Sequence, residues 1–127
     1  MSGRIESLKK TGDFKKVYNR GKCVSGQLFV VYALRNDLKM NRLGLSISKK
    51  VGKAVVRNRL RRRVKESYRL ILCGDVESGH DIVIVARATA GTLADDTAFA
   101  QITAALRNQF RKLDKLGFTL VPKRGEV

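Results

Sequence analysis

The chain has no tryptophan, one proline and one histidine, and it is poor in acidic residues. Its two cysteines, Cys23 and Cys73, are far apart in the sequence, and neither they nor His80 lie near another common zinc ligand, which excludes a zinc site. The few acidic residues are scattered or placed to cap helices, so no constellation of carboxylates is evident for acid–base or metal-assisted catalysis. We therefore predict no catalytic residue in the protein itself.

Long apolar runs are also absent. No segment reaches the about 18 apolar residues of a membrane span, and the first ten residues, MSGRIESLKK, lack the apolar core of a signal peptide. These features predict a cytoplasmic protein. Two cysteines in such a protein are more often free thiols, although the sequence alone leaves a disulfide between Cys23 and Cys73 open.

Positive charge is what the chain has in excess. Its 127 residues include 27 Lys and Arg against 11 Asp and Glu, a net charge of +16, and the pI is near 10.6. Hydrophobic residues make up 43% of the chain, enough for the core of a single domain. Because so much like charge repels itself, we expect a polyanion to neutralise it. Nucleic acid is the first candidate, and an anionic membrane surface is the second.

Apolar periodicity and turn residues predict one α+β domain, with helices packed on a small sheet in the order α-β-β-β-α-β-α. We expect a flexible N-terminus over 1–7, the compact domain over 8–116 and a loosely ordered tail over 117–127. Thr11 or Asp13 is expected to cap the first helix, and Gly21 to end it in a left-handed conformation. The expected elements are a helix at 11–20, strands at 27–34 and 42–48, a basic helix ending near 72 before Gly74, a strand at 81–88, and a helix at 94–113 with Asp95 and Asp96 in its first turn.

The charge is concentrated in KKVGKAVVRNRLRRRVKESYR, residues 49–69, which hold ten Lys and Arg against one acid, Glu66. Ordinary solvated helices mix the two signs, because like charges four residues apart cost a few tenths of a kcal/mol. At about 100° per residue, an apolar stripe lies on one side of this helix and cations lie on the others. The stripe should anchor the helix in the core and leave a basic face exposed; it consists of Val56, Leu60, Val64, Tyr68 and Ile71.

The start of this helix adds positive charge to the positive end of a helix dipole. Three lysines surround Gly52, whose bare backbone lets an anion approach the free amide groups. A Walker nucleotide loop is excluded, because Ala54 stands where Ser or Thr is needed and Ile47 stands where the first glycine is needed. Arginine predominates in the middle of the run, and its guanidinium group binds phosphate and stacks on bases. The pattern predicts a phosphate-backbone site on structured nucleic acid, whereas a membrane-binding helix would need Trp, Phe or Leu beside the basic face.

The segment SKKVGKAVVRNRLRRRVKESYR resembles the signature of the bacterial ribonuclease P protein subunit, whose hallmark is an Arg-Asn-Arg triplet, here Arg57, Asn58 and Arg59. LKKTGDFKKVYNRGK, LFVVYAL, RLGLSISKK and DIVIVARATA resemble the first helix and three strands of the same family, so the resemblance covers about residues 8–113. It implies a ribosomal-protein-like fold with a left-handed βαβ crossover, against the usual right-handed rule. It also implies that the protein joins a large catalytic RNA to remove the 5′ leader from precursor tRNA.

The resemblance implies two RNA-binding surfaces. In the family, the signature helix and the loop before it face the catalytic RNA; the matching residues are Lys49, Lys50, Lys53, Arg57, Asn58, Arg59, Arg61, Arg62 and Lys65. A cleft between the first helix and the sheet holds the single-stranded leader; the matching residues are Phe14, Tyr18, Tyr32, Lys15 and Arg20. Stacking on aromatic rings tolerates any base, as a protein that binds varied leaders requires, although an aromatic residue on a short helix is more often part of a core.

The resemblance assigns hydrolysis to the RNA subunit and to the Mg²⁺ that the RNA-containing holoenzyme requires. The expected enzyme is therefore the endoribonuclease complex, and no cofactor is expected on the protein side chains. Family members have metal ions near their loops, but the sequence assigns no ligand residue for them here. The alternative is a ribosomal or chromatin-like structural protein, which would explain the charge and the basic helix equally well but not the aromatic cleft.

Overall fold

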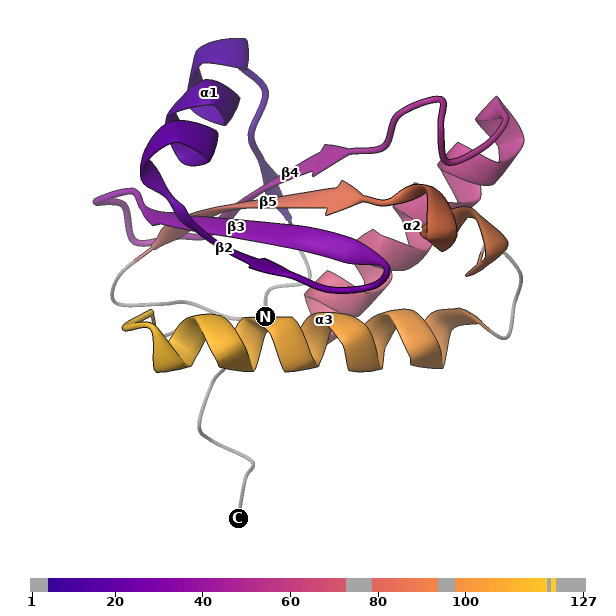
Figure 1. Ribbon diagram of the computed structural model, residues 1–127. Coiled ribbons are helices and arrows are strands. Elements are labelled where there is room, and N and C mark those ends of the chain that lie inside the picture. The colour runs from indigo at the N-terminus through magenta and orange to yellow at the C-terminus, as the bar shows by residue number, and fades with distance from the viewer. Residues whose placement is uncertain (1–4, 73–78, 94–97, 119, 121–127) are drawn as a thin grey trace.

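A five-stranded mixed sheet with three α-helices and a short 3₁₀ helix forms the domain (Figure 1). The computed structural model describes residues 5–72, 79–93, 98–118 and 120. The elements are β1 (Glu6–Ser7), α1 (Thr11–Arg20), β2 (Lys22–Ser25), β3 (Phe29–Arg35), β4 (Arg42–Ser46), α2 (Ala54–Ile71), β5 (His80–Ala86), η1 (Ala88–Leu93) and α3 (Ala98–Lys115). The α+β class is confirmed, and β2 supplies the third expected strand, whereas β1 and η1 were not predicted.

The strand order is β1-β4-β5-β3-β2. The pairs β1–β4 and β4–β5 are parallel, and β5–β3 and β3–β2 are antiparallel. Two parallel neighbours need a crossover connection, which α2 provides between β4 and β5. In Figure 1 this connection passes beneath the sheet and turns left-handed, as the family resemblance implied and against the usual rule.

The helices cover opposite faces of the sheet (Figure 1). Strand alternation sends Phe29, Val31 and Ala33 of β3 into the main core, which α2 and α3 close from below. On the other face, Val83 of β5 packs with Val17 of α1 in a smaller core. The domain is therefore three layers deep where α1 lies, whereas the first turns of α2 lie beyond the end of β4 (Figure 1).

The basic helix α2 is anchored as its pattern predicted. Leu60, Val64, Tyr68 and Ile71 are buried in the main core, and Val56 at the start of the stripe is half-buried. Where α2 crosses α3, the hydroxyls of Ser67 and Thr103 form a buried 2.7 Å hydrogen bond, and the Tyr68 and Phe110 rings meet edge to face. Burial raises the pKa of the Tyr68 hydroxyl.

The expected caps of α1 were wrong at both ends. Lys10 is the N-cap residue and makes no side-chain cap hydrogen bond, so neither Thr11 nor Asp13 has that role. Gly21 has φ −76°, which is not left-handed. A glycine is needed there for close approach instead, because a Cβ would lie 2.6 Å from the Val17 carbonyl oxygen and 2.8 Å from that of Ala33.

The chain beyond α3 is tied to the end of the sheet. Phe118 packs edge to face on His80, and Arg35 lies over the Phe118 ring and donates a 2.6 Å hydrogen bond to the Gly117 carbonyl. Burial, together with the nearby Arg35 cation, lowers the pKa of His80. Leu120 is also buried, and its amide donates to Asp114.

Several sequence expectations concern residues outside the described part of the chain. They include the helix end at Gly74, a disulfide to Cys73, the acidic first turn of the last helix at Asp95 and Asp96, and the rest of the tail with Pro122. Cys23 is exposed on β2. Within the described residues, no helix combines the length and apolar character that a membrane crossing demands.

Two glycines test how α1 is seated. A Cβ on Gly44 of β4 would lie 2.6 Å from the Phe14 ring, whereas a Cβ on Gly12 of α1 would meet nothing within 4 Å. We predict that Gly44→Ala, which overpacks this site, lowers the free energy of unfolding by about 1–3 kcal/mol. Gly12→Ala should raise it by about 0.4–1 kcal/mol, because alanine loses less backbone entropy on folding. Denaturant unfolding of both variants checks this; equal stabilities would contradict the seating of Phe14 on Gly44.

Candidate nucleic-acid interface

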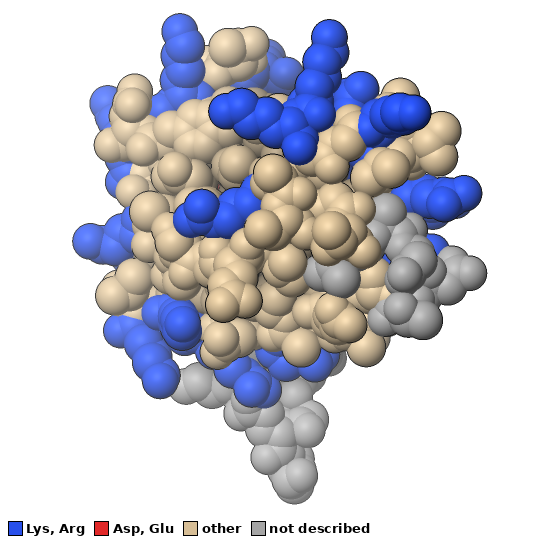
Figure 2. All heavy atoms as spheres, turned by 45° about the vertical axis from the view of Figure 1, so that its right-hand side comes forward, with Lys and Arg blue, Asp and Glu red and all other residues tan. Residues whose placement is uncertain are grey.

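The basic face is the set of nine residues from Lys49 to Lys65 that match the family signature. Lys49, Lys50, Lys53, Asn58, Arg59 and Arg62 are exposed, and Arg57, Arg61 and Lys65 are half-buried. Figure 2 looks onto the end of the molecule where α2 begins and η1 lies; Lys and Arg side chains surround this face, and no acidic side chain is seen among the described atoms. Among the described charged side chains, a phosphate backbone that approaches from this side meets only cations.

The N-terminus of α2 carries no anionic side chain. Its N-cap residue is Lys53, no side chain caps the first turn, and no acid lies in that turn. The preceding residue, Gly52, has φ +156°, a conformation that side chains disfavour. The first amide groups of the helix are thus left for an anion or water, as predicted from the sequence.

Arg57 has a role that the sequence did not reveal. Its Nε donates a 3.1 Å hydrogen bond to the carbonyl of Gly52, so one side chain of the Arg-Asn-Arg triplet holds the loop before the helix. Within the same triplet, Asn58 accepts a 3.0 Å hydrogen bond from Arg61. The first contact holds the loop on the first turn of α2 before any partner binds, and the second joins two successive turns within the helix.

The aromatic cluster consists of Phe14, Tyr18 and Tyr32. The Phe14 and Tyr18 rings are 6.4 Å apart, and the Tyr18 and Tyr32 rings meet edge to face at 5.0 Å. Tyr18 is 38% exposed, whereas Phe14 and Tyr32 are half-buried against the smaller core. The structure therefore brings the three predicted rings together across α1 and β3, partly as core and partly as accessible surface.

The basic neighbours predicted beside the aromatic cluster are exposed on α1. Lys15 and Arg20 lie on the same helix as Phe14 and Tyr18, and both are open to solvent. In Figure 1, α1 lies over one face of the sheet, the later part of α2 lies under the other, and the loop before α2 and its first turns lie beyond the end of β4. Two chemically different surfaces result: the cationic start of α2, and aromatic rings flanked by cations at α1.

An ion-pair network holds α1 over the sheet. Arg42 of β4 forms two hydrogen bonds with Asp81 of β5, at 2.8 and 2.7 Å, and lies 3.8 Å from Asp13 of α1. Asn36 donates a further 2.8 Å hydrogen bond to Asp81. The hydrogen bonds to Asp81 raise the pKa of Arg42. Asp81 is thus a structural partner of Arg42 and Asn36.

The described residues contain no group of three or more His, Cys, Asp or Glu side chains placed to hold a metal ion.

Sequence reasoning also missed two features beside the interface. Arg87 follows β5 and by alternation continues the column of Val83 and Val85, which faces α1. Gly91 of η1 packs so closely on the loop before α2 that a Cβ there would clash with the Val51 carbonyl. Strand alternation could have identified Arg87, whereas the η1 contact has no local sequence signal.

Comparison with known proteins shows the family of the chain. The family model described as ribonuclease P matches residues 3–114. The ribonuclease P protein component of Clostridioides difficile (strain 630) is 41% identical over 111 residues, which cover 87% of this chain and 94% of the relative. That of Clostridium botulinum (strain 657 / Type Ba4) is 45% identical over 105 residues, covering 83% and 91%.

Solved structures agree with the sequence relatives. The ribonuclease P protein of Staphylococcus aureus has a TM-score of 0.72 and 31% identity, with 87% of this chain and 96% of that chain covered. The protein from Thermotoga maritima has a TM-score of 0.65 and 29% identity, with 90% and 99% covered. The fold is therefore that of the bacterial ribonuclease P proteins. The chain belongs to the ribonuclease P protein family.

The contact between Arg57 and Gly52 predicts a difference between two arginines of the basic face. Arg57→Ala removes a hydrogen bond and should lower the free energy of unfolding by about 0.5–1.5 kcal/mol. Arg62 is exposed and makes no hydrogen bond or ion pair within the described residues, so Arg62→Ala should change stability by less than about 0.5 kcal/mol. Thermal melts in the absence of RNA measure both, and equal midpoints for the two variants would contradict the anchoring role of Arg57.

Proposed function

We propose that this protein is the protein subunit of ribonuclease P and acts in the cytoplasm. It binds the catalytic RNA through the basic face and the 5′ leader of precursor tRNA through the aromatic cluster. In this way it assists the endonucleolytic removal of the leader that gives the mature 5′ end of the tRNA. The observation that carries the proposal is that one domain presents two surfaces with different chemistry, the cationic start of α2 and the aromatic rings of α1 and β3.

The basic face fits a structured RNA. The planar guanidinium group of arginine can donate two parallel hydrogen bonds to phosphate oxygens. The uncapped N-terminus of α2 adds amide donors at the same end of the helix. Because Arg57 already holds the loop on the first turn of α2, less conformational entropy is lost when the RNA binds. Family membership points to the same partner, the catalytic RNA.

The aromatic cluster fits a single strand rather than a duplex. Base stacking on exposed rings requires bases that are not already stacked in a helix, and it does not depend on sequence. Tyr18 offers the most exposed ring, with Lys15 and Arg20 near it for the backbone phosphates. A leader of variable sequence is a substrate of this kind.

We assign hydrolysis to the RNA subunit and to the Mg²⁺ ions that it holds. Phosphodiester cleavage needs metal ions or acid–base groups at a convergent site. The carboxylates that the structure describes near the cluster, Asp13 and Asp81, are engaged with Arg42 instead. The protein is therefore the enzyme's binding component, and the holoenzyme is the endoribonuclease.

The competing function is that of a ribosomal or chromatin-like structural protein. It would account for the basic face but gives no use to accessible aromatic rings on α1 and β3. Cleavage of precursor tRNA by a bacterial catalytic RNA, with and without this protein at low Mg²⁺, distinguishes the two functions. Only a ribonuclease P subunit should increase cleavage.

Mutations on the two surfaces should have different effects on RNA binding. We predict that Tyr18→Ala weakens holoenzyme binding of a precursor with a leader of several nucleotides by about 1–3 kcal/mol, because one stacked base loses its platform. Tyr18→Phe keeps the ring and should retain the affinity. Arg62→Ala should instead weaken assembly with the catalytic RNA for every substrate. Equilibrium binding of long-leader and leaderless tRNA by each reconstituted holoenzyme measures these effects.

Tyr18 is a useful choice because its exposure keeps the folding cost of truncation small, and a melt of each variant confirms that it is folded. If Tyr18→Ala and Tyr18→Phe bind long-leader and leaderless substrates with the same relative affinity, the cluster does not bind the leader. If Tyr18→Ala loses affinity for both substrates equally, its ring contacts another part of the complex.

A further inference from the structure

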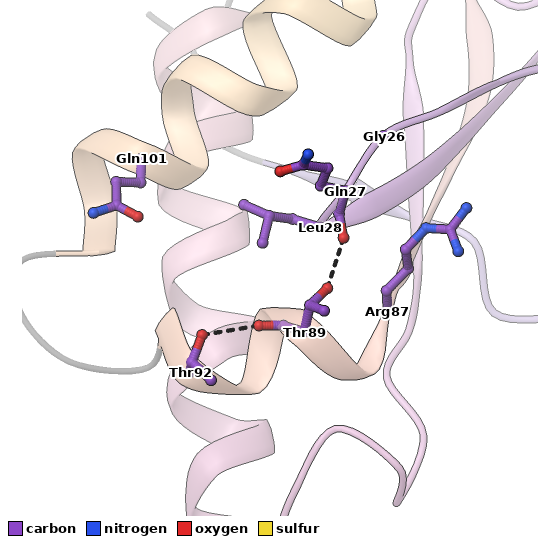
Figure 3. Close-up of a pocket in the computed structure, with 7 residues that line it drawn as sticks. All are labelled: Gly26, Gln27, Leu28, Arg87, Thr89, Thr92 and Gln101. Carbon is purple, nitrogen blue, oxygen red and sulfur yellow. Dashed lines mark hydrogen bonds between the residues drawn. The ribbon is translucent and has the colours of Figure 1, made fainter.

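A pocket of about 580 Å³ lies where the β2–β3 turn, η1 and the first turn of α3 meet (Figure 3). Its volume is within the range of ordinary ligand sites, about 300–1,000 Å³. Figure 3 shows Leu28 between Gln101 on one side and Arg87 on the other, with Thr89 and Thr92 beneath. The pocket belongs neither to the basic face nor to the aromatic cluster.

The walls of this pocket are fixed by hydrogen bonds. Thr89 donates a 2.6 Å bond to the Gln27 carbonyl, and the Arg87 amide donates a 2.8 Å bond to the Leu28 carbonyl (Figure 3 shows the first). Behind the turn, the buried side chain of Gln109 donates to the carbonyls of Val24 and Phe29. The turn is thus held from both sides, and the pocket exists before any ligand binds.

The side-chain amides of Gln27 and Gln101 are available to a ligand. Both side chains are exposed at the pocket, and neither makes a hydrogen bond within the described part of the chain. A side-chain amide offers one acceptor and two donor hydrogens, which is the pattern that pairs with the edge of a nucleobase. Leu28 supplies an apolar surface for the face of a base, and Arg87 is the one charged side chain among the lining residues that the structure describes.

The pocket also lies between the two surfaces assigned to RNA. Val83 pairs with Tyr32 of the aromatic cluster, and the column that continues through Val85 ends at Arg87 in the pocket lining. The four residues from Val83 to Arg87 span about 13 Å. On its other side, η1 packs on the loop before α2 through Gly91 and Val51. A single strand that leaves the aromatic cluster along β5 arrives at Arg87 and then at the two amides.

We propose that this pocket is a subsite for one nucleotide of the single-stranded leader, with its base held by the amides of Gln27 and Gln101. The proposal rests on the proposed function and deepens it, because hydrogen bonds to a base edge discriminate between bases and stacking does not. The ribonuclease P protein would then bind most leader positions without regard to sequence and discriminate at one.

The test uses holoenzyme reconstituted with a bacterial catalytic RNA and the double variant Gln27→Ala with Gln101→Ala. Both positions tolerate alanine, since Gln27 uses only its backbone carbonyl to bind Thr89 and Gln101 is exposed on a helix. Asn108→Ala removes an exposed amide elsewhere on α3 and is the matched control. The probes are precursor tRNAs with a full leader, with one abasic nucleotide at each leader position in turn, and with no leader.

We expect the double variant to bind the full-leader precursor about 2- to 10-fold more weakly, as the loss of one or two hydrogen bonds implies, and Asn108→Ala to bind like the wild type. At one leader position an abasic nucleotide should weaken wild-type binding and leave the double variant unaffected, which is the coupling expected of two groups in contact. No variant should change the affinity for leaderless tRNA.

Wild-type affinity of the double variant for every leader, or a loss that persists with leaderless tRNA, would overturn the subsite while leaving the proposed function in place. Equal loss at all abasic positions, without coupling, would do the same. If the wild-type holoenzyme itself binds full-leader and leaderless substrates equally, the assignment of the leader to this protein fails, and the subsite fails with it.

Discussion

Burial of one apolar stripe of α2 is the interaction on which the rest of the structure depends. Fully burying a large apolar side chain contributes about 1.5–3 kcal/mol, and α2 buries Leu60, Val64, Tyr68 and Ile71. Within the helix, four pairs of like charges are spaced four residues apart, each costing about 0.2–0.5 kcal/mol. The burial exceeds the repulsion severalfold. The helix can therefore carry a field that would unfold an unanchored segment, and that field is then available to a polyanion.

The sheet presents different side chains to α2 on one face and to α1 on the other. Because side chains alternate along each strand, β3 and β5 supply one set of residues to the core that holds α2 and another set to the face under α1. The Arg42–Asp81 pair and the packing of Phe14 on Gly44 fix α1 on its face. The rings beside α1 and the core that anchors α2 are thus supported by opposite faces of the same sheet.

Helical periodicity and strand alternation predicted the features that depend on neighbouring residues in the sequence. The helical period of 49–72 gave the buried stripe and the exposed cations, and alternation gave β4 and β5 within a few residues. The positions of Phe14, Tyr18 and Tyr32 came from the family resemblance, and the structure joins them as a cluster. That these residues contact RNA remains a prediction, as it does for the basic face.

Features set by distant parts of the chain were missed. Gly21 was expected to be left-handed, whereas it is required by the approach of Ala33 from the neighbouring strand. The bond from Arg57 to Gly52 and the packing of Gly91 on Val51 depend on how a loop folds back, which no periodicity records. The pocket at Gln27 and Gln101 joins a turn to a helix more than 70 residues later in the chain. Such contacts follow from the topology, which the sequence alone did not reveal.

The salt dependence of binding to the catalytic RNA tests the central claim, that α2 presents its charge to phosphates, most directly. If the basic face neutralises about six phosphates, log affinity should fall against log salt with a slope of about −4 to −5, because each contact releases about 0.7–0.9 counterion. Replacing both Arg59 and Arg62 with alanine should make the slope shallower by about 1.4–1.8. A wild-type slope shallower than about −2, or a slope that the double variant leaves unchanged, would contradict the account.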